Sequence, residues 1–207
     1  MMTSPPSVPP PERIVDTTAL RHFTLIGQAP LLVQTLGGTV NVPREVFDPE
    51  EDLNSPEALL SELGRTIRYV TGHRYTDPDR REHASRLQAL RVERAIRVID
   101  LSDDELTFSA ELSGTTFQRR FCLAGRLGSG EAAVMSIAIS RRWVAVIDDG
   151  VARNVLSQLS PETQILTSQV LLRTAVAAEL IDSAAAQIVY NDLLCGGFRG
   201  PETLWAD

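Results

Sequence analysis

The stretch Trp143-Val144-Ala145-Val146-Ile147-Asp148-Asp149-Gly150 decides which fold this chain is expected to adopt. Its first five residues are a continuous apolar run, which is typical of a strand buried on both faces of a parallel sheet. Two acids and a glycine follow at once, and this combination indicates a turn. The stretch therefore predicts a central strand that places Asp148 and Asp149 at its carboxyl end.

Short apolar segments and amphipathic segments alternate on both sides of this strand. Further strands are predicted at residues 13–15, 39–42, 95–101 and 163–167, and the first of them ends directly at Asp16. Helical spacing or end signals predict helices from residue 17 onward and at 31–36, 55–72, 80–94, 131–140, 151–159, 170–180 and 182–195. The order predicts an α/β fold of three layers, with a central parallel sheet flanked by helices.

Two helix starts carry specific signals. Ser55-Pro56-Glu57 has a capping serine, a proline suited to the first helical position and an early acid. Ser102 and Glu105 have the spacing of a capping box, although residues 106–112 alternate as a strand would. We favour a helix there because the cap is well formed. Residues 115–126 carry no clear pattern.

Length and composition indicate one domain without a disulfide framework. The 207 residues divide into a Pro-rich leader expected to be disordered (1–12), a single domain (13–200) and a short tail (201–207). Cys122 and Cys195 are far apart and are expected to be buried as small apolar residues. No apolar run is long enough to span a membrane, and no secretory signal opens the chain, so we expect a cytoplasmic protein.

The charge is unevenly distributed. The net charge is −7 and argues against a broad nucleic-acid-coating surface. All 20 basic residues are Arg, and nine of them lie between Arg65 and Arg97, where only four acids occur. Two interpretations stay open for this Arg-rich part of the extended segment 73–126 and the helix before it. It is either a solvated helix face or a strip that contacts phosphate, which the guanidinium group binds in a bidentate manner.

Acids are predicted to gather at one edge of the sheet. Asp16 follows the first strand, Asp148 and Asp149 follow the central one, and Glu131 opens the helix before it. Two carboxylates about 4 Å apart repel by roughly 4 kcal/mol at an effective dielectric constant near 20. A shared proton, an Arg or a divalent cation could offset this repulsion. Mg²⁺ or Mn²⁺ suits carboxylate oxygens best and would favour phosphodiester hydrolysis.

Several stretches resemble the PIN-like family, in a subgroup related to VapC-type toxin ribonucleases. They are Ile14-Val15-Asp16-Thr17-Thr18-Ala19-Leu20, Val40 to Val46, Leu127 to Val134, Val146 to Arg153 and Val170 to Ile181. The most specific part is Gly130-Glu131 together with Asp148-Asp149 and Arg153. The resemblance covers most of the chain from Ile14 to about Phe198, and it implies a Rossmann-like, three-layer PIN-like fold.

The resemblance also implies roles for individual residues. Asp16, Glu131 and either or both of Asp148 and Asp149 would be catalytic residues and ligands of Mg²⁺ or Mn²⁺. In many members a further acid stands three positions past the residue equivalent to Val46, where this chain has Pro49. Its neighbours Asp48 and Glu50 are therefore tentative metal ligands. Arg153, Thr17 and Thr18 would contact substrate or support the site.

The leading hypothesis is a metal-dependent endoribonuclease, the toxin of a type II toxin–antitoxin pair. The resemblance implies an RNA substrate, an antitoxin protein as partner and a homodimer, with no membrane association. The alternative, motivated by Pro49, is a catalytically inactive PIN-like scaffold that binds nucleic acid or a protein. A phosphatase or phospho-acceptor domain is a weaker option, because most such domains need a Lys and this chain has none.

Overall fold

A computed structural model describes residues 11–72, 78–123 and 125–206. The leader at residues 1–10 and residues 73–77 of the extended segment lie outside the described residues. The elements in chain order are β1 (Arg13–Val15), α1 (Thr17–Leu25), α2 (Ala29–Thr35), β2 (Val40–Pro43), η1 (Glu57–Leu59), α3 (Glu62–Gly72), α4 (Pro78–Val92), β3 (Ile96–Ile99), α5 (Asp103–Leu112), α6 (Thr115–Arg120), α7 (Ser129–Arg141), β4 (Val144–Val146), α8 (Gly150–Leu159), β5 (Ile165–Leu166), α9 (Ser168–Ala177) and α10 (Ser183–Cys195).

The strands are parallel, as predicted. β4 lies between β1 and β5 in a three-stranded sheet, while β2 and β3 form a separate parallel pair. In the first pairing Val15 lies opposite Val146, and the Asp16 amide donates to the Val146 carbonyl at 3.0 Å. β2 packs beside β1, where the Asn41 side chain donates to the Arg13 carbonyl at 2.8 Å. The segment that begins at Trp143 is thus the central strand of its sheet.

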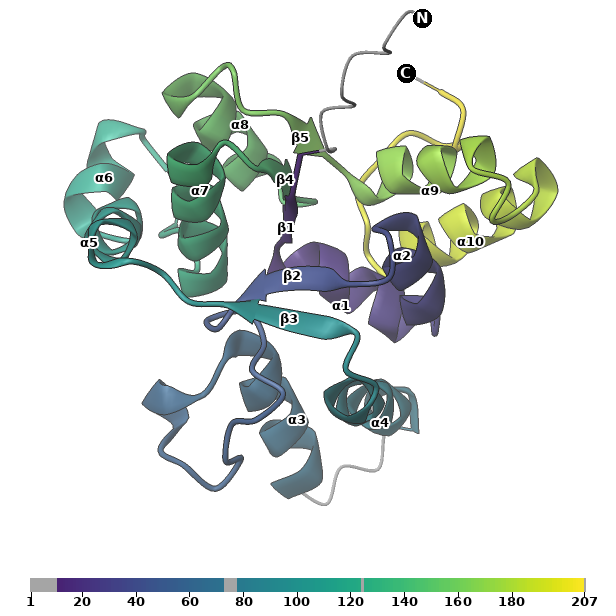
Figure 1. The fold of residues 1–207 in the computed structure, drawn as a ribbon, viewed down its shortest axis with the longest axis horizontal. Helices are drawn as coiled ribbons and strands as arrows, with labels where there is room; N and C mark the ends of the chain where they lie inside the picture. Colours follow the sequence, from purple (N-terminus) through teal and green to yellow (C-terminus); the bar gives the residue numbers. More distant parts are fainter. Residues whose placement is uncertain (1–10, 73–77, 124, 207) are drawn as a thin grey trace, which may run out of the picture.

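Helices cover both sides of the strands, which confirms the three-layer expectation (Figure 1). α7 packs against β1, β2 and β4, with α5 on its outer side. On the other side α1 and α2 lie near α9 and α10, and α2 packs against α9. α3 and α4 pack together beyond the β2–β3 pair and also contact α1.

The order of elements explains why acids from separate segments meet. In a parallel arrangement a helix that precedes a strand runs opposite to it, so its first turn lies at the strand's carboxyl end. α7 precedes β4 and therefore begins near the point where β4 delivers Asp148. α1, α8 and α9 follow β1, β4 and β5 and begin at the same edge. We call this carboxyl edge of β1, β4 and β5 the acidic edge.

The prediction of one helix from Ser55 to Gly72 is wrong in its first part. Residues 57–59 form only one 3-10 turn, and Leu60 is extended, with φ −86° and ψ 144°. α3 begins at Glu62 instead, where the Ser61 hydroxyl accepts a hydrogen bond from the Gly64 amide at 2.9 Å. The carboxylate of Glu51 holds Ser61 in place through its amide and hydroxyl. A cap from a distant loop therefore sets the start of this helix.

The capping box predicted at Ser102 and Glu105 is confirmed, and α5 follows it. Glu105 is only 3% exposed, although it is charged. Arg141 at the end of α7 pairs with it through both carboxylate oxygens, at 2.7 and 2.6 Å, and lowers its pKa. α6 occupies residues 115–120, which the sequence left unassigned.

One expectation about the C-terminal half needs correction. Cys122 and Cys195 are exposed rather than buried. The tail packs on the domain, since Leu204 is fully buried and its carbonyl accepts from Arg173 Nε at 2.8 Å. Within the described residues, no helix has the length and apolar character to cross a bilayer.

Replacing Glu105 with Ala should lower the free energy of unfolding by about 2 kcal/mol, because it removes the capping box and leaves Arg141 without its carboxylate. Urea denaturation at pH 7 measures the change. Ser102→Ala is the matched control, and it should cost only about 1 kcal/mol because it removes the cap alone. Equal losses for the two variants would contradict a stabilising role for the Arg141 pairing.

Candidate functional site

Asp16 lies at the centre of the acidic edge and is fully buried. It caps α1, and its Oδ1 accepts a hydrogen bond from the Ala19 amide at 2.6 Å. Its Oδ2 is buried with no hydrogen-bond partner in the described structure. Burial raises the pKa of Asp16 well above its usual value, and the charges of Asp148 and Glu131 raise it further, against the smaller opposing effect of two backbone amides.

Asp148 is held in one orientation by three hydrogen bonds. Its Oδ1 accepts from the Ser168 amide at 2.8 Å, and its Oδ2 accepts from the Ser168 hydroxyl at 2.6 Å. Nδ1 of the buried His22 lies 2.8 Å from the same Oδ2. Phe198 packs edge-on against the His22 ring at 5.7 Å between centroids. No local pattern pointed to His22 or Ser168 in this role, because they lie 126 and 20 positions from Asp148 in the chain.

Asp149 and Glu131 form the second part of the acidic edge. Asp149 caps α8 by accepting from the Ala152 amide at 2.8 Å. Glu131, in the first turn of α7, accepts from the Gly128 amide at 2.8 Å. Burial raises the pKa of Glu131, and the charges of Asp149 and Glu62 add to this effect. The two members of the Asp148–Asp149 pair thus have different neighbours. The charge of Asp148 raises the pKa of Asp16, and the charge of Asp149 raises the pKa of Glu131.

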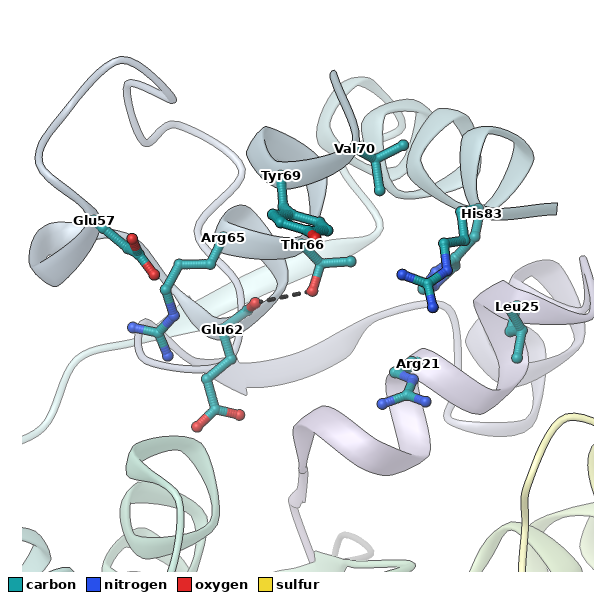
Figure 2. Close-up of a pocket in the computed structure, with 10 residues that line it drawn as sticks. Arg21, Leu25, Glu57, Glu62, Arg65, Thr66, Tyr69, Val70 and His83 are labelled. Carbon is teal, nitrogen blue, oxygen red and sulfur yellow. Dashed lines mark hydrogen bonds between the residues drawn. The ribbon is translucent and has the colours of Figure 1, made fainter. Parts of the chain in front are cut away.

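Glu62 is an acid of this edge that the sequence analysis missed. Its carboxylate accepts from the Thr17 hydroxyl, from the Gly130 amide at 2.9 Å and from the Ser129 hydroxyl at 3.1 Å. Figure 2 shows it pointing from α3 toward the helix that follows Gly128. Glu62 was missed because its helix was expected to begin at Ser55, so Glu62 was expected in the interior of that helix and not in its first turn.

Glu45 is a second missed acid on the border of the site. Its Oε2 is buried and makes no hydrogen bond to any described residue, and its carbonyl accepts from the Glu62 amide at 2.8 Å. Burial raises the pKa of Glu45, with smaller contributions in the same direction from Asp100 and Glu62. Glu45 follows the end of β2 by two residues, so the same search for acids after predicted strands could have identified it.

The tentative ligand Asp48 is engaged by other groups, and Glu50 follows it in the same loop. Asp48 pairs with Arg44, and its Oδ1 accepts from the Glu50 amide at 2.9 Å. Neither Asp48 nor Glu50 is among the groups that shift the pKa of Asp16 or Glu131.

The three residues expected to support the site differ in their positions. Thr17 contacts Glu62 rather than Asp16, and Thr18 is half-buried in the first turn of α1. Arg153 is half-buried on α8, and its Nε makes no hydrogen bond to any described residue. Its guanidinium lies near Gly150, where an added Cβ would be 3.9 Å from one terminal nitrogen. Arg153 therefore lies over the turn that carries Asp149.

The oxygens of these acids suit a hard divalent cation, and the buried Asp16 Oδ2, which has no hydrogen-bond partner among the described residues, is an oxygen that could bind one. Among residues 11–72, 78–123 and 125–206, however, no three His, Cys, Asp or Glu side chains are arranged to hold one metal ion. The acids instead couple in two electrostatic groups, Asp16 with Asp148 and Glu131, and Glu131 with Asp149 and Glu62. Glu131 belongs to both groups and links them.

Replacing Asp16 with Asn should stabilise the metal-free protein, because the folded state holds a carboxyl whose charged form is disfavoured. A raised folded pKa means that the folded state binds the proton more tightly than the unfolded state does. Stability due to this group therefore falls as pH rises from the unfolded value, near 4, through the folded one.

Melting temperatures in EDTA from pH 5 to 8 measure this effect. The Asp16→Asn variant should exceed the wild type by about 3 °C or more at pH 8, and by less at pH 5. Burial lowers the pKa of His83 to about 4, but this contribution is common to both proteins and cancels in the difference. A difference that shrinks as pH rises would contradict the raised pKa of Asp16.

Replacing Gly130 with Ala should destabilise the acidic edge. An added Cβ would lie 2.6 Å from Thr17 Oγ1 and 3.0 Å from Glu62 Oε2, so it would separate the two groups that hydrogen-bond each other. We expect a loss of about 2 kcal/mol in urea denaturation. Gly150→Ala is the matched control, since its nearest neighbour would be 3.9 Å away. Similar values for both variants would refute the close approach.

Comparison of the chain with protein-family models, with curated proteins and with solved structures found no match in any of the three.

Proposed function

We propose that this chain is a divalent-metal-dependent nuclease, most specifically an endoribonuclease, whose active site is the acidic edge. The observation that carries the proposal is the fully buried Asp16, which has an orphaned oxygen and lies in the field of two further acids. A structural carboxylate is normally paired when it is buried. An unpaired one that repels its neighbours destabilises the fold, and such groups are concentrated at functional sites.

The acids of the edge would have different roles. Asp16 and Glu131 would hold Mg²⁺ or Mn²⁺ between them, while Asp149 and Glu62 would add to the negative charge around Glu131. Asp148 would position the neighbouring residues of the acidic edge, because its own oxygens are already engaged by Ser168 and His22. The cation, when bound, would neutralise the carboxylates and steady the negative charge that develops on a phosphoryl oxygen.

The first turns of the surrounding helices would support an anionic substrate. α1, α7, α8 and α9 all begin at the acidic edge, and the amino end of a helix favours negative charge. Arg153, beside the Asp149 turn, would contribute a fixed positive charge to a phosphate there. A toxin role with an antitoxin partner and a homodimeric assembly remain parts of the proposal that come from the sequence resemblance.

A second candidate function is a non-catalytic scaffold of the same fold that binds nucleic acid or protein. It is favoured by one specific observation, which is that no three described acids are arranged around a common point for a metal. The two functions differ in the effect of added metal, because a scaffold would neither bind Mn²⁺ at the acidic edge nor cleave RNA.

The test is cleavage of a labelled single-stranded RNA by purified protein with added Mn²⁺ or Mg²⁺, with a single-stranded DNA of the same sequence in parallel. Asp16→Asn and Glu62→Gln should each lower the rate by about 100-fold or more, since each removes a charge that helps to hold the cation. Asp182→Asn is the matched control, because Asp182 also caps a helix but is exposed on α10.

The same proteins should be compared by thermal melting in millimolar Mn²⁺. The wild type should be stabilised by the metal and Asp16→Asn should not, because the ligand has been removed. Absence of both cleavage and stabilisation in the wild type would contradict the nuclease proposal and favour the scaffold. Cleavage of DNA but not RNA would retain the nuclease and overturn the ribonuclease assignment.

A further inference from the structure

A hollow of about 600 Å³ opens between α1, α3 and α4, beside the acidic edge (Figure 2). We call it the α1–α3–α4 pocket. Its size is within the range of pockets that hold a small ligand or a nucleotide. Arg21 reaches into it from α1, and Tyr69 and Arg65 come from α3.

The pocket is richer in positive than in negative side chains, although the chain as a whole has a net charge of −7. Arg21, Arg65 and Arg80 line it, against Glu57 and Glu62. Arg21 is exposed, and no ion pair joins it to another residue in the described parts of the chain. This pocket is therefore a place where a phosphate group would be attracted to a largely acidic molecule.

One residue joins this pocket to the proposed active site. Glu62 lines the pocket, and its carboxylate accepts hydrogen bonds from Ser129 and Gly130 at the start of α7. The Thr17 hydroxyl, next to Asp16 in the chain, donates to the same carboxylate. A strand bound in the pocket would therefore lead directly to the acidic edge.

An aromatic ring stands at the wall of the pocket formed by α3. Tyr69 is 48% exposed, and Figure 2 shows its ring on the side that faces the cavity, above Thr66. A nucleobase can stack on such a ring only when it is unpaired, because bases in a duplex are already stacked on one another. Guanidinium groups around an aromatic ring are the combination used to bind single strands.

We propose that the α1–α3–α4 pocket binds single-stranded nucleic acid next to the phosphate to be cleaved, with Arg21 and Arg65 contacting its backbone and Tyr69 stacking on one base. This inference rests on the proposed nuclease function, and it names the path of the substrate. It also gives a role to the Arg-rich part of the chain, since two of the three pocket arginines belong to it.

The test is fluorescence anisotropy of a labelled 12-nucleotide single-stranded RNA in EDTA, so that binding is measured without cleavage. Arg21→Glu and Arg65→Glu should each weaken binding by about tenfold and reduce the salt dependence by roughly 0.7 per lost phosphate contact. Tyr69→Ala should weaken binding by about tenfold, whereas Tyr69→Phe should keep the wild-type affinity. A single-stranded DNA of the same sequence, and a duplex formed from the same RNA and its complement, are measured in parallel.

Arg119→Glu is the matched control, because Arg119 is exposed on α6, on a different part of the molecule from α3 and α4 (Figure 1). Arg65 also donates to the Leu60 carbonyl at 3.1 Å, so the melting temperature of its variant is measured, and Arg21→Glu is the deciding variant. Equal weakening by Arg21→Glu and Arg119→Glu would overturn the proposal. Equal affinity for the duplex and the single strand would overturn the stacking role of Tyr69.

The outcomes separate this inference from the proposed function. Binding that depends on Arg21 and Tyr69 in a protein that never cleaves would refute the nuclease and retain the pocket. Metal-dependent cleavage in a protein whose RNA affinity is unchanged by Arg21→Glu and Tyr69→Ala would refute the pocket and retain the nuclease.

Discussion

The burial of the Asp16 carboxylate beside the end of β4 is the constraint on which the rest of the structure depends. The pairing of β1 with β4 fixes it there, because the Asp16 amide is the last donor to the Val146 carbonyl. A carboxyl in this position cannot reach water, so its ionisation must be offset by something inside the fold.

Backbone amides at the starts of helices supply part of that offset. Asp16 and Asp149 each accept from an amide of the helix that they cap, and Asp148 accepts from the first amide of α9. Glu131 accepts from the amide of Gly128, the cap residue of its own helix. Glu62 uses the first turn of α7 in the same way from outside. These amides offset only part of the cost of burial, because the pKa of Asp16 and that of Glu131 both stay raised.

The parts of the site that could be predicted from the sequence are those set by local pattern. A buried strand followed by an acid is recognisable in a single segment, which is why Asp16 and the Asp148–Asp149 pair were found. Glu62 was not found, because the start of α3 is fixed by the distant carboxylate of Glu51 on Ser61 rather than by its own residues. His22 and Ser168 were missed for the same reason, since only the tertiary fold brings them to Asp148. The sequence could not show that Arg65 and Arg80 of the Arg-rich part line one pocket with Arg21, because only the tertiary fold brings α1, α3 and α4 together.

The orphaned Oδ2 of Asp16 also has a thermochemical consequence. Burial increases the affinity of this carboxyl for a proton, so a proton competes for it with any cation that enters the edge. Proton binding and cation binding are therefore linked. Occupation of the edge would release protons to the buffer. The heat recorded by calorimetry would then depend on the ionisation enthalpy of the buffer, and the apparent affinity would fall as the solution is acidified.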